Sequence, residues 1–155
     1  MIVRKMQTHE FDVTVNLFGY YRDEAVESLP EIADEYDENS VIETIRMFAS
    51  NWNYCWFNVY DGQRPVGFIA GYISACPWNS KLLDANIAFI YLLDSHKNMA
   101  NFAELLKKFE EWSRLVGARS MTAGDIGINP ERTTKLYEHF GFKPGVWLGK
   151  ELTNV

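Results

Sequence analysis

The chain has 155 residues, 47% of them hydrophobic and 15% aromatic, so we expect one globular domain over residues 1–155 and no disordered protein. No apolar run reaches the roughly 18 residues that cross a bilayer, and the first residues lack the apolar core of a signal peptide, which predicts a cytoplasmic protein without a membrane partner. The net charge of −6 argues against nucleic acid as a partner, and the spacing of Cys55 and Cys76 suggests no metal site.

The acidic residues are concentrated in one part of the chain. Residues 23–43 contain nine acids and no Lys or Arg, whereas the rest of the chain has 12 acids and 15 bases. We call residues 23–43 the acidic segment. A solvated helix face is one interpretation, and electrostatic attraction of a cationic substrate is the other.

The first part of the chain predicts a strand and two helices. Residues 2–7 alternate between apolar and polar and predict the strand. Thr8 is a candidate cap for the first helix, and Pro30 interrupts the helical pattern. Asn39 or Ser40 is a candidate cap for the second helix.

The middle of the chain predicts three consecutive strands. Residues 52–60 and 66–75 are rich in aromatic and β-branched residues, and residues 61–65 between them contain an Asp-Gly turn signal. Residues 77–80 predict a loop, and the apolar run 85–93 predicts a further strand that contains no carboxylate.

The last part predicts a helix over 100–116 with Gly117 as its C-cap, a strand over 119–123, a helix over 130–140 and a final strand over 146–152. The predicted order is β-α-α-β-β-β-α-β-α-β. The two strands on either side of the long helix should be parallel, because the helix serves as a crossover connection.

This order and two motifs resemble the GNAT superfamily of N-acetyltransferases. Residues 57–68 are similar to the second and third strands of the family, and residues 136–142, Leu-Tyr-Glu-His-Phe-Gly-Phe, are similar to its Leu-Tyr-x-x-x-Gly-Phe ending. The resemblance implies an α/β fold with a mixed, largely antiparallel sheet, splayed parallel fourth and fifth strands, and helices on both faces. It also implies an acyltransferase that moves an acetyl group from acetyl-CoA to a primary amine, and it suggests a homodimer.

The resemblance also locates a cofactor site, from which this chain departs. The family holds the CoA pyrophosphate at the start of the long helix with [Arg/Gln]-x-x-Gly-x-[Gly/Ala]. Asn98, Asn101 and Ala103 occupy the motif positions in one register, and Lys97, Ala100 and Phe102 in the other, so neither register contains a glycine. The implied cofactor contacts are Leu92, Leu93, Lys97, Asn98, Met99, Ala100, Asn101, Phe102, Ala103 and Asn129.

For catalysis, the resemblance implies that Tyr137 protonates the leaving thiolate and that a backbone N–H near Leu93 polarises the thioester. The alternative is that Tyr137 is an ordinary core tyrosine. Asp125 and either Glu24 or Glu27 are the candidate general bases, although ordinary surface charge would also explain these carboxylates. His139 lies two residues after Tyr137 and should point elsewhere on a helix.

In the family the first two helices wall the acceptor site. The aromatic and acidic residues Tyr20, Tyr21, Glu27, Trp52 and Trp78 are therefore candidate contacts for a cationic small molecule or peptide amine, although packing alone would also explain the aromatic residues. Two alternatives stay open: a catalytically inactive GNAT-fold binding or structural protein, such as a viral accessory or particle-associated component, and a nucleic-acid-modifying member of the superfamily.

Overall fold

The computed structural model describes residues 1–124, 129–146 and 148–152. In chain order the elements are β1 (Ile2–Lys5), the 3-10 turn η1 (Thr8–Glu10), α1 (Phe11–Ser28), α2 (Ile32–Glu35), α3 (Glu38–Ser50), β2 (Tyr54–Asp61), β3 (Arg64–Cys76), β4 (Asn79–Leu92), the 3-10 turn η2 (Asp94–His96), α4 (Met99–Leu115), β5 (Ala118–Thr122) and α5 (Pro130–His139).

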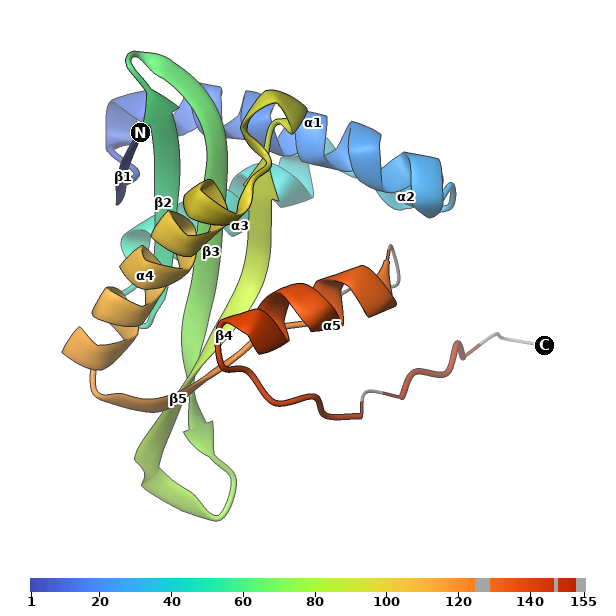
Figure 1. The fold of residues 1–155 in the computed structure, drawn as a ribbon. Helices are drawn as coiled ribbons and strands as arrows, with labels where there is room; N and C mark the ends of the chain where they lie inside the picture. The colour runs from blue at the N-terminus through green and yellow to red at the C-terminus, as the bar shows by residue number, and fades with distance from the viewer. Residues whose placement is uncertain (125–128, 147, 153–155) are drawn as a thin grey trace.

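The described strands form a five-stranded sheet in the order β1-β2-β3-β4-β5. Neighbours are antiparallel except β4 and β5, which are parallel and are connected through α4, as predicted. Helices α1 and α3 cover one face of the sheet, while α4 and α5 lie on the other (Figure 1). The predicted α/β fold with a mixed, largely antiparallel sheet and helices on both faces is confirmed.

Each face of the sheet has its own apolar core. On the α4 side, Leu105 and Phe109 pack on β3 and β4. Gly71 makes this packing close: a Cβ built on it would lie 2.3 Å from the carbonyl oxygen of Asn86 and 2.4 Å from the ring of Phe109. The other core is a group of aromatic rings around the fully buried Trp56. Packing on both faces fixes the position of β4, on which the candidate site is built.

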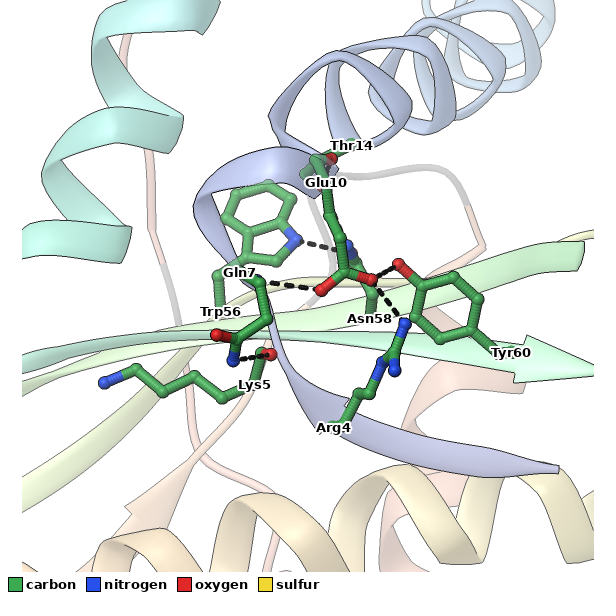
Figure 2. A network of polar contacts seen from close by, with 8 residues as sticks. All are labelled: Arg4, Lys5, Gln7, Glu10, Thr14, Trp56, Asn58 and Tyr60. Carbon is green, nitrogen blue, oxygen red and sulfur yellow. Dashed lines mark hydrogen bonds and ion pairs between the residues drawn. The ribbon is translucent and has the colours of Figure 1, made fainter. Parts of the chain in front are cut away.

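The start of α1 is attached to the sheet by a buried polar network (Figure 2). The carboxylate of Glu10, whose side chain is 5% exposed, accepts hydrogen bonds from the backbone N–H of Gln7 at 2.9 Å, from Arg4 at 2.8 Å and from the Tyr60 hydroxyl. The bond to Gln7 forms part of a capping box at the N-terminus of η1. One carboxylate therefore connects β1, β2 and the first turn before α1.

A second chain of hydrogen bonds lies beside Glu10 in the same network (Figure 2). The indole N–H of Trp56 donates to Asn58, the Asn58 amide donates to the Thr14 hydroxyl, and Thr14 donates to the backbone carbonyl of Glu10. Because these groups bond to one another, they can lie in the core without the penalty of unsatisfied burial.

Several predicted boundaries were wrong. The cap of η1 is Gln7 and not Thr8, and the cap of α3 is Asp37, whose carboxylate accepts from the N–H of Ser40. The β3–β4 turn consists of Pro77 and Trp78, so strand β4 begins at Asn79, inside the predicted loop 77–80. The predicted final strand over 146–152 is also wrong, since its described residues, 146 and 148–152, form no strand.

Candidate active site

A groove of about 730 Å³ opens beside β4, where α1, the start of α4 and α5 converge. It forms because, within the part of the chain that the structure describes, β5 pairs with β4 only over residues 83–86. Beyond that point, the part of β4 from Ile87 to Leu92 pairs with β3 on one side and lines the groove. Where two parallel strands separate in this way, the edge of one of them becomes available to a ligand.

The hydrogen bonds of the β4 end decide which backbone groups face the groove. The N–H of Leu93 donates to the carbonyl of Val66 at 2.9 Å. Along an antiparallel strand, residues alternate between those bonded to the partner and those directed away from it. Leu92 and Ile90 are therefore the residues whose backbone groups point to the edge that lacks β5. The predicted thioester contact was a backbone N–H near Leu93. The N–H of Leu93 itself is used within the sheet, whereas that of Leu92 points to the open edge.

Tyr137 lines the groove from α5. The helix is set by Asn129, whose side chain caps the N–H of Arg132, and by Pro130 in its first turn. The Tyr137 side chain is buried, and its ring meets those of Phe102 and Phe142 edge to face at 5.5 and 5.0 Å between centroids. These aromatic contacts restrain the ring at the wall of the groove.

Side chains hold the glycine-free turn before α4 together. The Asn98 side chain accepts a hydrogen bond from the backbone N–H of Asn101 at 2.9 Å, and the Asn101 amide donates to the carbonyl of His96 at 2.8 Å. The ring of His96 in turn bonds to Asp61 in the β2–β3 hairpin at 2.9 Å. The Asn98 cap therefore occupies a helix N-terminal N–H of the kind to which a bound anion would otherwise bond.

A charged cluster borders the groove between α1 and η2. Lys97 bonds to Glu24 of α1 and lies 2.9 Å from the carboxylate of Asp94. Burial lowers the pKa of Lys97, but its bonds to the two carboxylates outweigh that effect and raise the pKa above its ordinary value. Burial, the charge of Glu24 and a hydrogen bond with Glu24 together raise the pKa of Tyr91. Lys97 is therefore charged and Tyr91 protonated at neutral pH.

Residues 17–142 match the model of the acetyltransferase (GNAT) family. The chain belongs to this family. It is therefore grouped with acyltransferases, in agreement with the resemblance in its strands and its Leu-Tyr-x-x-x-Gly-Phe ending. No helix within the described ranges is both long enough and apolar enough to cross a membrane.

Solved structures share the GNAT fold at low sequence identity. An aminoglycoside acetyltransferase from an uncultured soil metagenomic sample is 15% identical with a TM-score of 0.73, covering 99% of this chain and 98% of its own. The aminoglycoside acetyltransferase AAC(6')-Iy, in complex with a bisubstrate analogue, is 13% identical with the same TM-score and the same coverage. A ribosomal-protein-alanine N-acetyltransferase from Brucella melitensis biovar Abortus 2308 is 13% identical with a TM-score of 0.73, covering 99% and 100%. No curated protein matches the sequence.

The groove of this GNAT chain brings together part of the predicted site. Among the predicted residues it contains Tyr21, Glu24, Leu92, Lys97, Asn98, Met99, Phe102, Asn129 and Tyr137. Leu93, Ala100, Asn101 and Ala103 are not part of its lining, and Asp125 lies outside the described residues.

The other predicted acceptor contacts lie away from the groove. Tyr20, Trp52 and Trp78 are 57%, 72% and 84% exposed, with Trp78 in the β3–β4 turn, and Glu27 is also exposed. None of the four lines the groove, so their role in substrate binding stays a prediction.

Sequence reasoning missed two groups of residues. Because β4 begins early, it contains a carboxylate, Asp84, which accepts bonds from Ser120 at 2.6 Å and Arg119 at 3.0 Å. These bonds, with that from Ser120 the largest cause, lower the pKa of Asp84 and make it a weak base. The second group is a row of bases on α5, among them His139, which lines the groove together with Tyr137 despite the spacing argument.

A larger hollow of about 1070 Å³ lies on the other side of α5, against α4 and β5. Tyr137 borders both cavities, but the edge of β4 from Ile87 to Leu92 lines only the groove. The groove is therefore the stronger candidate for an active site.

Proposed function

We propose that the protein is an acetyl-CoA-dependent N-acetyltransferase whose acceptor is a cationic primary amine, either a small molecule or a peptide. One observation carries this proposal. The edge of β4 over residues 87–92, the start of α4 and Tyr137 of α5 line a single groove in a member of the GNAT family.

The residues present fit acetyl-CoA. Its pantetheine arm contains amides that an unpaired strand edge can bond, and Ile90 and Leu92 direct their backbone groups to that edge. Asn98 and Met99, at the start of α4, line the same groove. When bound, acetyl-CoA supplies the acetyl group as a thioester.

Tyr137 is the proposed general acid. A phenol is protonated at neutral pH and can donate its proton to a departing thiolate. The N–H of Leu92 is the proposed donor to the thioester oxygen, as a preorganised backbone dipole. Both groups are positioned by the fold itself, Leu92 through the β3–β4 pairing and Tyr137 through its ring contacts.

Glu24 and Asp125 are the proposed bases that accept the proton of the ammonium group. Glu24 lines the groove but already bonds to Lys97, so it serves as a base only when Lys97 has another partner. Asp125 is proposed from its place in the sequence, three residues after β5 ends at Thr122.

The proposed acceptor follows from the charge around the groove. The acidic segment lies on the end of α1, on α2 and on the start of α3, and eight of its nine acids are exposed. Exposed carboxylates attract a cation over a distance of about 8 Å in physiological salt. The neighbours named as aminoglycoside and ribosomal-protein-alanine acetyltransferases support an amine acceptor by analogy of fold.

The test is a thiol-release assay with acetyl-CoA and a panel of polyamines, aminoglycosides and peptides, together with thermal unfolding in the presence of CoA. At about 100 times the dissociation constant, CoA should add about 2.7 kcal/mol to the free energy of unfolding. Tyr137→Phe should lower kcat and keep this shift. Tyr54→Phe is the control, because Tyr54 packs on Phe48 and does not line the groove. Undiminished turnover in Tyr137→Phe would remove Tyr137 from the mechanism.

A second candidate is a GNAT-fold protein that binds a partner without catalysis. It is favoured by the turn before α4, where Asn98 already caps the helix and Lys97 is already paired. A wild-type protein that unfolds at the same temperature with and without CoA, and releases no thiol with any amine, would favour this candidate over the enzyme.

A further inference from the structure

The face of α5 that borders the groove is basic. Arg132, Lys135 and His139 are spaced i, i+3 and i+7, which places them on one side of a helix, and all three line the groove. The acids of α5, Glu131 and Glu138, line no part of it. The charges of this short helix are therefore separated, with the bases on the side toward the groove.

The other charges of the groove compensate each other. Among the described residues its lining contains a single carboxylate, Glu24, and Glu24 bonds to Lys97. Arg132 and Lys135 form no ion pair with a described residue. The positive charge that remains available to a ligand in the groove is consequently that of α5.

The start of α4 offers less to an anion than a glycine turn would. The side chain of its N-cap, Asn98, accepts a hydrogen bond from the backbone N–H of Asn101. The adjacent cation Lys97 forms ion pairs with both Glu24 and Asp94. A phosphate at this end would have to displace a hydrogen bond or compete with two carboxylates. At α5 it would meet exposed cations that no described carboxylate neutralises.

We propose that Arg132 and Lys135 of α5, with His139 at the end of the row, bind a phosphate group of CoA and replace the glycine-rich turn as the main anion site of the groove. This assignment rests on the proposed function, since it takes CoA as the ligand. Guanidinium and ammonium groups bind phosphate oxygens through charge-assisted hydrogen bonds, and Arg does so with two parallel bonds. The phosphate is either the diphosphate or the 3′-phosphate, and the probes below separate the two.

The experiment compares the binding of CoA, dephospho-CoA and pantetheine by titration calorimetry. The test variant is Arg132→Gln/Lys135→Gln. The matched control is Lys81→Gln/Lys107→Gln, which removes the same two charges from exposed positions that do not line the groove. The dissociation constant of CoA should rise about tenfold or more in the test variant and less than about twofold in the control. The difference should shrink in 1 M salt, because a Debye length of about 3 Å screens exposed charges.

Each probe identifies part of the ligand. Pantetheine, which has no phosphate, should bind the wild type and the test variant equally. If the wild type and the test variant bind dephospho-CoA equally, the row of bases binds the 3′-phosphate. If the test variant still binds dephospho-CoA more weakly than the wild type, the row of bases binds the diphosphate. If Lys97→Gln weakens CoA binding tenfold and the α5 variant binds CoA like the control, the anion is held at α4 and the inference is wrong. A wild-type protein that fails to bind CoA would instead overturn the proposed function.

Discussion

Replacing Glu10 with alanine should destabilise the protein by about 2–4 kcal/mol. Its carboxylate accepts three hydrogen bonds, and bonds to charged groups contribute about 1.5–3 kcal/mol each when buried. The full sum is not lost, because the side chain of Arg4 is 52% exposed and regains water in the variant. The Tyr60 hydroxyl is buried with the carboxylate, so the loss of its acceptor dominates the cost.

Urea denaturation followed by circular dichroism measures this loss. With a slope of about 2 kcal/mol/M for a domain of this size, the midpoint should fall by about 1–2 M. Glu104→Ala is the control, because Glu104 is exposed on α4 and forms no ion pair among the described residues, and it should stay within about 0.5 kcal/mol of the wild type.

A double-mutant cycle isolates the contact with Tyr60. Tyr60→Phe removes the hydroxyl and keeps the ring, so the loss from Glu10→Ala should be smaller in that background by about 1 kcal/mol or more. Two results would refute the assignment of this carboxylate as the connection between α1 and the sheet. One is that the stability losses of Glu10→Ala and Tyr60→Phe simply add in the double variant. The other is that Glu10→Ala unfolds at the same urea concentration as Glu104→Ala.

Further predictions concern packing, pH and substrate attraction. Gly71→Ala should lower the free energy of unfolding by about 2 kcal/mol or more, because its Cβ would lie 2.3 Å from the backbone oxygen of Asn86. Gly19→Ala in α1 is the control, because its Cβ meets nothing within 4 Å, and it should stabilise the protein by about 0.5–1 kcal/mol. Thermal unfolding of the two variants measures this difference. The pKa of Asp84 is lowered in the folded protein, so its contribution to stability is present above the unfolded pKa and is lost as pH falls through the folded pKa. Asp84→Asn should therefore flatten the acid side of a curve of unfolding free energy against pH. An unchanged acid side would contradict this prediction. Replacing several acids of residues 23–43 with amides should raise KM for a cationic amine at low salt and not in 1 M salt, and a KM indifferent to both would reject electrostatic attraction.

The fold was predictable where a local pattern had a local cause. The Asp-Gly pair predicted the β2–β3 hairpin, where Gly62 has a φ of 61°. The apolar face of α4 identified the helix that packs on the sheet. The start of β4 was missed because residues 79–84 are mostly polar. They pair with β3 near an exposed end of the sheet, so no apolar run marks them. The final strand over 146–152 was a wrong prediction, because residues that suit a sheet form no strand without a partner strand to pair with.

The candidate site was predictable only in part. Tyr137 followed from a motif within seven consecutive residues, and the structure places it in the groove. The bond between Lys97 and Glu24 joins residues 73 positions apart, and no local pattern reports such a contact. The bases of α5 carried a detectable signal in their i, i+3, i+7 spacing. That signal acquires meaning only when the fold shows which side of the helix borders the groove.

Under the proposed function, the acidic segment has a consequence for the end of the catalytic cycle. Acetylation converts an ammonium group into a neutral amide, so an acceptor with one amine loses its charge in the reaction. For the proposed cationic acceptor, the exposed carboxylates on α1, α2 and α3 would therefore attract the substrate but would hold the product only by its uncharged parts. The surface proposed to raise the rate of encounter would then impose no electrostatic penalty on release. For an acceptor with several amines, each transfer would weaken the attraction in turn, so a polyamine would leave after one or a few acetylations.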